Sequence, residues 1–133
     1  MPNREEIHNC VEQLLVATTT AADATPVASA AIDTLGFDSA HFTLAIGATL
    51  GSGAGAMTYK VTECDTVGGT YTDAPSTSVV DDGSALAANT AKRIAYVGAK
   101  QFAKLLVTPK ANDVYTVLGH KGYASQKPTA NPA

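Results

Sequence analysis

MTYKVTECDTVGGTYTDAP, residues Met57 to Pro75, and AKRIAYVGAKQFAKLLVTP, residues Ala91 to Pro109, decide the fold of this chain. In each stretch, two short segments rich in Val, Ile, Thr and Tyr flank turn residues, Val67-Gly68-Gly69 in the first and Gly98-Ala99 in the second. β-Branched and aromatic residues favour strands, and glycine favours tight turns. Each stretch therefore predicts two β-strands joined by a tight turn, and neither contains a reactive centre.

A period of two recurs along the rest of the chain. Within His41 to Thr49, the apolar Phe42, Leu44 and Ile46 alternate with His41, Thr43 and Ala45, as in a strand that buries one face. Leu86 to Thr90 fits either a helical turn or a loop. About seven short strands separated by turn residues predict an all-β chain, an antiparallel β-sandwich or jelly-roll-like domain. The other expected strands are Val27–Asp33, Ile94–Val97, Phe102–Val107 and Val114–Leu118.

The first 25 residues have a different pattern. Apolar residues fall at i, i+4, i+7 and i+8 (Ile7, Val11, Leu14 and Leu15), which predicts one face of a short helix over Glu5 to Val16, with Asn3 as a candidate N-cap. The threonines at 18–20 favour an extended arm as the alternative. We expect an N-terminal arm and spacer over residues 1–25, a β-sandwich domain over 26–122 and a polar C-terminal tail over 123–133.

Composition excludes several classes of function. The chain has 133 residues, a net charge of −3 and 16% charged residues, whereas nucleic-acid binders need a clustered basic face. The densest basic group, Lys92, Arg93, Lys100 and Lys104, is expected to cover one solvated strand face. The polar start, MPNREEIHN, has no signal-peptide core, and no apolar run approaches 18 residues. We therefore expect a soluble protein made inside a cell, with no nucleic-acid and no membrane partner.

No constellation in the sequence predicts catalysis, a cofactor or a metal site. Gly51 to Ala56 fits G-x-G-x-x-A, but a predicted strand follows it instead of the helix that dinucleotide binding needs. The three histidines, His8, His41 and His120, lack metal-ligand spacing. The carboxylates near strand ends suit turn capping, with calcium binding as the alternative. Cys10 and Cys64 are expected to be free thiols.

Four blocks in order resemble a known family: GFDSAHFTLAIG (36–47), VTECDTVGGTYTDAP (61–75), AKRIAYVGAKQFAKLLVTP (91–109) and VLGHKGYASQKP (117–128). They look like successive blocks of small tailed-bacteriophage head decoration (capsid cement) proteins. The chain departs from that family at Cys64, where an acidic residue or serine is common. It also departs at residues 101–104, where Arg-Tyr-Val-Arg is frequent, which leaves Lys104 as the candidate cation for capsid contact.

The resemblance implies a structural protein on the outside of the virion head, without enzymatic activity. It would bind the major capsid protein at threefold or quasi-threefold sites as a homotrimer and stabilise the capsid lattice. The candidate interface residues are Ile7, Val11, Leu14, Leu15 and Lys104. The alternatives are another virion role, in the tail or the head–tail connector, and a host-surface or carbohydrate-binding module.

Overall fold

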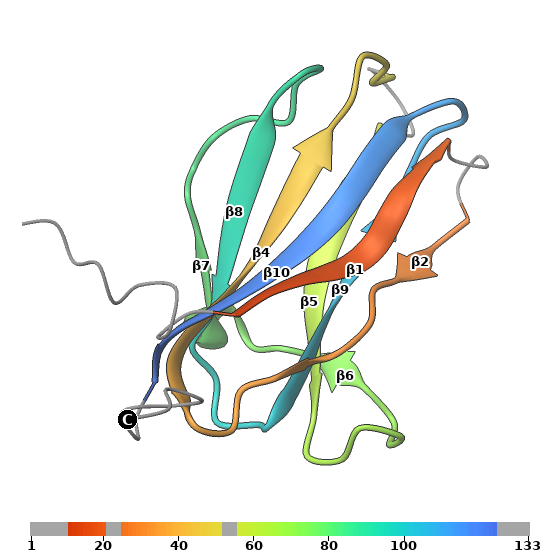
Figure 1. Ribbon diagram of the computed structural model, residues 1–133. Helices are drawn as coiled ribbons and strands as arrows, with labels where there is room; N and C mark the ends of the chain where they lie inside the picture. The colour runs from red at the N-terminus through yellow and green to blue at the C-terminus, as the bar shows by residue number, and fades with distance from the viewer. Residues whose placement is uncertain (1–10, 21–24, 52–55, 125–133) are drawn as a thin grey trace, which may run out of the picture.

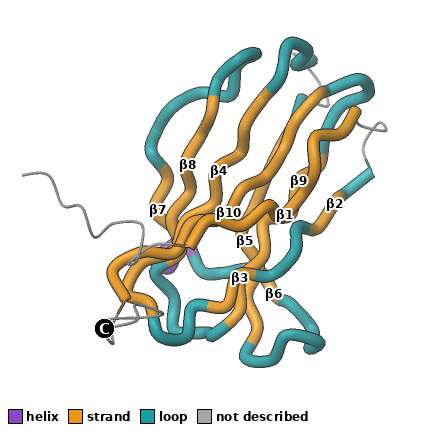
Figure 2. Tube along the Cα trace, in the orientation of Figure 1, coloured by secondary structure: helices purple, strands orange, loops and turns teal. Residues whose placement is uncertain are grey.

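The computed structural model describes residues 11–20, 25–51 and 56–124, and it is an all-β sandwich of two antiparallel sheets (Figures 1 and 2). This confirms the predicted fold class. The sheet nearer the viewer in Figure 1, here called the front sheet, has the strand order β1 (Val11–Thr20), β10 (Val114–Ala124), β4 (Phe37–Ile46), β8 (Ala91–Tyr96) and β7 (Val79–Asp81). The back sheet has the order β2 (Val27–Ala28), β9 (Phe102–Thr108), β5 (Thr58–Cys64) and β6 (Thr72–Asp73), and β3 (Ile32–Asp33) also pairs with β9. A short 3₁₀ turn, Ser76–Ser78, precedes β7.

The core lies between the sheets and follows the predicted alternation. Phe42 and Leu44 of β4, at the centre of the front sheet, are fully buried, and so are Leu105 and Val107 of β9 in the back sheet. Because side chains alternate across a strand, the intervening residues of β4 point outward, away from the core. The core therefore uses one face of each sheet and leaves the other face of the front sheet free to form a surface.

One of the two predicted hairpins is correct and the other is wrong. β5 and β6 pair as predicted, with Thr62 opposite Asp73. β8 and β9, however, lie in different sheets: β8 pairs with β4 and β7, and β9 pairs with β5, β2 and β3. The connection between them is held by the Tyr96 hydroxyl, which accepts a hydrogen bond from the Lys100 amide (3.1 Å) and donates one to Glu63 (2.6 Å). Turn residues show where the chain reverses, but burial across the whole domain decides which strands pair.

The helix predicted over Glu5 to Val16 is wrong for its described part, because Val11 to Thr20 form strand β1. This strand pairs with β10, from Val11 opposite Lys121 to Thr20 opposite Val114. Leu15 is buried against Gly119, where a Cβ atom would lie 2.9 Å from Leu15 Cδ1. Glycine at 119 is therefore what lets Leu15 pack into the core.

The chain between β1 and β4 also differs from prediction. The single strand expected over Val27–Asp33 is divided into β2 and β3, because the Ser29 hydroxyl accepts the hydrogen bond of the Leu105 amide (3.0 Å). Residues 86–90 form a loop and not a helical turn. The predictions for Asn3, Ile7 and Cys10 fall outside the described residues. The arm boundary and the jelly-roll assignment stay predictions, and the alternation of strands between the two sheets is compatible with the latter.

Candidate functional site: the front face and the uncharged end

The structure separates the interface residues that the sequence singled out. Val11 and Leu14 are exposed on β1, with Leu14 60% exposed, whereas Leu15 is 7% exposed and belongs to the core. Lys104 lies on the back sheet, where its ammonium group sits over the Tyr71 ring, 4.2 Å from the centroid. Ile7 is outside the described residues. These residues therefore do not form one surface, and only Val11 and Leu14 share an exposed strand.

The expectation that four basic residues cover one solvated face is also wrong. Lys92 points into the sandwich and its side chain is only 5% exposed. Lys100 pairs with Asp65 in the turn that follows β5, with Nζ 2.6 Å from the carboxylate. Arg93 and Lys104 lie on the front and the back sheet respectively. Alternation along β8 explains the outcome, because adjacent residues of a strand point to opposite faces.

Lys92 is the centre of a polar cluster between the two sheets. Its ammonium group donates to Asp81 (2.6 Å), to Asp82 (3.3 Å) and to the Ser84 carbonyl. Tyr59 of the back sheet donates to Asp81 at 2.5 Å. Burial opposes the charge of Lys92, but the hydrogen bonds with Asp81, Tyr59 and Asp82 outweigh it and raise the pKa of Lys92 above its usual range. The cluster therefore keeps a buried charge satisfied and fixes the turn that follows β7.

The carboxylates of this cluster also cap the turn, as the sequence predicted. The Gly83 amide donates to Asp81 (2.7 Å) and the Ser84 amide donates to Asp82 (2.9 Å). The hydrogen bond from Lys92 lowers the pKa of Asp81, and the hydrogen bond from the Ser84 hydroxyl, followed by that from the Arg93 amide, lowers the pKa of Asp82. Both groups are thus held as carboxylates at neutral pH.

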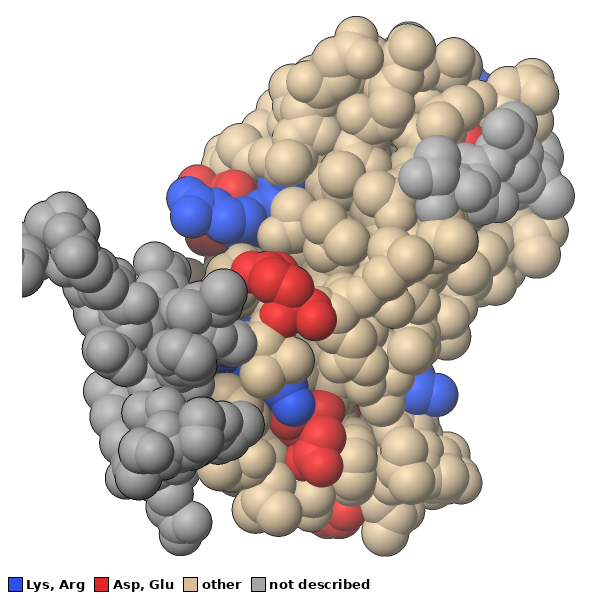
Figure 3. Space-filling model, in the orientation of Figure 1, with Lys and Arg blue, Asp and Glu red and all other residues tan. Residues whose placement is uncertain are grey.

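The outer face of the front sheet, called the front face from here on, is built from all five strands of that sheet. Most of its side chains are small or apolar. Charged side chains lie on either side of the central strand β4: Glu12 on β1, and on the other side Arg93 on β8 with Asp81 and Asp82 beside it. Figure 3 shows charged atoms in a band across this face, with a broad uncharged area above the band. The uncharged outward residues are Leu14, Thr43, Ala45, Val80, Ala91, Ala95, Thr116 and Leu118.

The apolar groups on the front face lie on two sides of β4. On one side, Leu14 of β1 is directly opposite Leu118 of β10, and both are exposed. On the other side is a shallow hollow of about 210 Å³, whose lining includes His41, Val80, Arg93 and Ala95 together with Asp81 and Asp82. A projecting leucine pair and a hollow therefore occupy opposite sides of the same face.

Two histidines, His120 on β10 and His41 on β4, lie on the front face between Glu12 of β1 and the hollow. Glu12, His120 and His41 lie opposite one another on the adjacent strands β1, β10 and β4. The two imidazoles stack with their centroids 4.7 Å apart, and His120 Nδ1 contacts the Glu12 carboxylate. Burial, followed by the charges of His120 and Arg93, lowers the pKa of His41, although Glu12 acts in the opposite direction.

This arrangement predicts a pH dependence of stability. Because the pKa of His41 is lower in the folded state than its ordinary value of 6.5, the unfolded chain binds more protons in this range. The contribution of His41 to the free energy of unfolding is fully present above pH 6.5. It is lost as the pH falls below that value toward the pKa of His41 in the folded state. We expect urea unfolding at pH 5 to 8 to show stability rising with pH, and a shallower rise in His41→Gln. Identical pH profiles for the two proteins would contradict the prediction.

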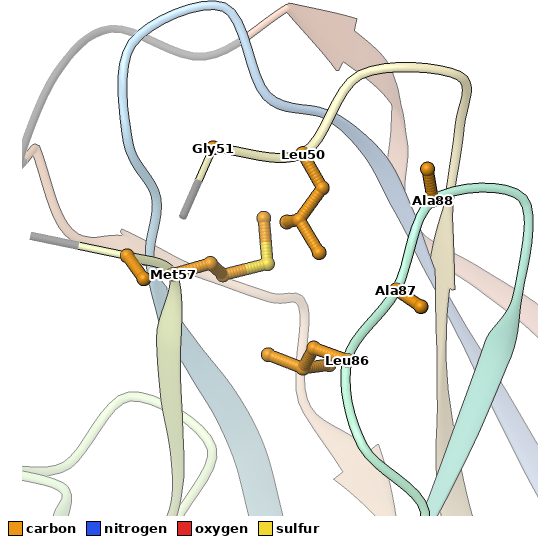
Figure 4. A pocket seen from close by; sticks show the side chains of 7 residues that line it. Leu50, Gly51, Met57, Leu86, Ala87 and Ala88 are labelled. Atoms are coloured by element: carbon orange, nitrogen blue, oxygen red, sulfur yellow. The ribbon is translucent and has the colours of Figure 1, made fainter. Parts of the chain in front are cut away.

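A second surface, called the uncharged end, is formed by the loops 47–51 and 84–90 at the end of the sandwich that is uppermost in Figure 1. Neither loop contains a charged residue, but the neighbouring β9–β10 loop brings two charged residues beside Gly51: the Lys110 side chain lies against it, and the Asp113 carboxylate accepts a hydrogen bond from its amide (2.7 Å). Between the two uncharged loops, Leu50, Met57 and Leu86 point toward one another around a pocket of about 320 Å³, which Gly51, Ala87 and Ala88 also line (Figure 4). At the opposite end, Lys100 pairs with Asp65, and Gln101 donates to Asp33 (3.0 Å). The two loops around the pocket are therefore uncharged, whereas both ends of the molecule carry charged side chains.

Neither surface carries a recognisable reaction centre. In the described part of the chain, no group of three His, Cys, Asp or Glu side chains is placed to hold a metal ion. No aromatic side chain whose exposure is described is fully exposed, as a flat sugar-binding face would require. Within the described ranges, no helix has the length and apolar character of a membrane span. The shape and the exposed apolar side chains of these two surfaces suit binding to another protein.

Comparisons of the chain with protein-family models, curated proteins and solved structures found no match. The roles of the front face and the uncharged end can therefore be inferred only from their geometry. Sequence alternation could have identified Leu14, Leu118 and Val80 as an apolar set, once their strands were known to share a sheet. Nothing in the sequence placed the two loops of the uncharged end beside each other.

Proposed function

We propose that this chain is a structural protein of a tailed-bacteriophage virion, a head decoration protein without enzymatic activity. It binds the outside of the capsid at threefold or quasi-threefold sites as a homotrimer and stabilises the lattice of the major capsid protein. The support is the resemblance of four sequence blocks to that family, together with a compact β-sandwich whose surfaces suit protein contact. A ligand that binds only the assembled lattice stabilises it by mass action, which is the physical basis of a cement protein.

The observation that carries the proposal is the apolar pocket between two loops that contain no charged residue. Loops 47–51 and 84–90 meet at one end around the apolar pocket of Leu50, Met57 and Leu86, without a charged side chain in either loop. These two loops are suited to pack on a protein surface, because neither loop has a charge that must be dehydrated; the charged residue beside them is Lys110, next to Gly51. We therefore assign the uncharged end to the capsid and the opposite end, with its Lys100–Asp65 ion pair, to the solvent.

The test is the amount of the protein on purified heads. Adding Leu86→Asp to heads that lack the protein should give at least tenfold lower occupancy than the wild type, because about 1.4 kcal/mol of lost contact already gives a factor of ten. A trimer multiplies the loss through avidity. The matched control is Val67→Asp, at an exposed position in the turn between β5 and β6, which should bind like the wild type.

Occupancy is read from gel densitometry or mass spectrometry of the heads, and folding of each variant from its far-UV spectrum. Wild-type protein that never associates with heads would overturn the proposed function. Wild-type protein recovered on tails, or on the head–tail connector, would assign the alternative virion role. Equal occupancy by the two aspartate variants would move the contact away from the uncharged end.

A further inference from the structure

We propose that the free edge of β5, with the groove beside it, binds an extended segment of a second protein, which adds to the back sheet as a further strand. The segment has an apolar residue opposite Tyr59 and an acidic residue opposite Lys60. This inference goes beyond the proposed function and does not depend on it. It is argued from the backbone hydrogen bonding, the shape and the charge of one side of the sandwich.

The first argument is that β5 is fully paired on one side only. On that side β9 pairs with it from end to end. On the other side β6 pairs with Thr62 and Glu63 alone, and the Ala74 amide donates to the Val61 carbonyl (2.9 Å). The chain then leaves the back sheet at Pro75 and crosses to β7 through the 3₁₀ turn. The first part of β5, residues 58–60, therefore has a free edge within the described part of the chain.

The backbone of Tyr59 points to this free edge. Leu105, which lies opposite Val61 on β9, directs its amide and its carbonyl to Ser29 on the far side (3.0 and 2.9 Å). Because hydrogen-bonded and non-hydrogen-bonded pairs alternate along an antiparallel ladder, the N–H and C=O of both Val61 and Tyr59 face away from β9. Among the described residues, those two groups of Tyr59 have no hydrogen-bond partner. Unpaired groups on a strand edge are a template for an added strand.

The second argument is a groove of about 340 Å³ between β5 and β7. Its lining includes the buried Val61 and Ile94 together with Val79. Residues directly opposite each other on neighbouring strands lie on the same face of a sheet. Tyr59 points to the inner face, since its hydroxyl donates to Asp81 of the front sheet. A residue opposite Tyr59 on an added strand therefore directs its side chain into the groove, where an apolar group would cover Val61 and Ile94.

The third argument is charge at the next position. Lys60 follows Tyr59 and so lies on the outer face, and its side chain is 52% exposed. Its ion pair with Asp73 is exposed on both sides and contributes little, so a second carboxylate can share the ammonium group. An added strand that continues the line of β6 is antiparallel to β5, so its residue opposite Lys60 comes just before its residue opposite Tyr59. An acidic residue followed by an apolar residue fits this order.

The experiment is an NMR titration of the full chain with the peptide acetyl-Glu-Ile-Thr-Val-Thr-amide. In the proposed register its glutamate faces Lys60 and its isoleucine enters the groove. Hydrogen exchange of the Tyr59 amide should slow at least about tenfold at saturation, because that N–H becomes hydrogen bonded. The matched peptide with an N-methylated isoleucine cannot donate to the Tyr59 carbonyl and should bind at least about tenfold more weakly.

Variants of the chain test the groove and the charge separately. Val79→Arg should weaken binding by filling the groove. Lys60→Glu, at an exposed position that keeps the fold, should bind the glutamate peptide about threefold more weakly and prefer a peptide with lysine in its place. The matched control is Arg93→Glu, the same kind of charge reversal on the front face, which should bind like the wild type.

The contrary results are specific. An unchanged Tyr59 amide at about 10 mM peptide, or equal binding of the N-methylated peptide, would overturn the added strand. A Lys60→Glu variant that still prefers the glutamate peptide would overturn the register. A Tyr59 amide already protected in the chain alone would show that the edge is occupied by this chain or, where protection rises with protein concentration, by another copy. None of these results depends on whether the protein occupies heads.

Discussion

Replacing Leu15 with alanine should lower the free energy of unfolding by about 2–5 kcal/mol, the range for truncating a buried leucine. Leu15 is 7% exposed and belongs to the main hydrophobic cluster, and its side chain lies against Gly119 of the neighbouring strand. The substitution removes buried methyl groups and leaves a space that the rigid backbone of β10 fills poorly. Chemical denaturation followed by far-UV circular dichroism, at a fixed protein concentration, measures the effect.

The matched control is Leu35→Ala, since Leu35 is 71% exposed in the turn before β4. Its effect should stay within about 0.5 kcal/mol, as for most surface substitutions. If Leu15→Ala changed stability as little as Leu35→Ala, β1 would not be part of the cooperative sandwich. The segment would then act as the N-terminal arm that the sequence predicted.

Replacing Lys92 with alanine should lower the free energy of unfolding by about 2–3 kcal/mol, because hydrogen bonds to charged groups contribute about 1.5–3 kcal/mol each and their loss leaves polar partners unsatisfied. The ammonium group joins Asp81, Asp82 and the Ser84 carbonyl. Asp81 and Asp82 are partly exposed, so water replaces some of what they lose. The control is Lys60→Ala. Both side chains of the Lys60–Asp73 ion pair are exposed, so removing this pair should cost less than about 1 kcal/mol.

The effect of Lys92→Ala on stability should also depend on pH in the acid range. The pKa values of Asp81 and Asp82 lie below the ordinary value of 3.8 in the folded state, so their contribution to stability is present above pH 3.8 and is lost as the pH falls through the folded values. Lys92 is the largest cause of the shift at Asp81. The stability difference between the wild type and Lys92→Ala should therefore shrink below pH 3.8. A difference that stays constant down to about pH 2.5 would show that Lys92 acts through packing alone.

The parts of the fold that were predictable are those that depend on near neighbours in the chain. The alternation of Phe42, Leu44 and Ile46 determined the buried face of β4, and the turn at Val67-Gly68-Gly69 joins the β5–β6 hairpin as expected. Asp81 and Asp82 cap their turn, as the sequence predicted for carboxylates near strand ends. The front face was not predictable, because its residues come from five strands whose order in space is not the order of the chain.

The amino-acid sequence by itself determined that this chain is all β, where most strands and turns fall, and which side of each strand is apolar, because these follow from propensities and a period of two. Tertiary structure alone decided that residues 11–20 are a strand, that β8 and β9 belong to different sheets, and that Lys92 is buried while Arg93 faces outward. The physical reason is that a short apolar pattern is compatible with more than one backbone conformation and partner. The choice is made by burial against residues distant in sequence, here Gly119 for Leu15 and the Asp81–Asp82 turn for Lys92.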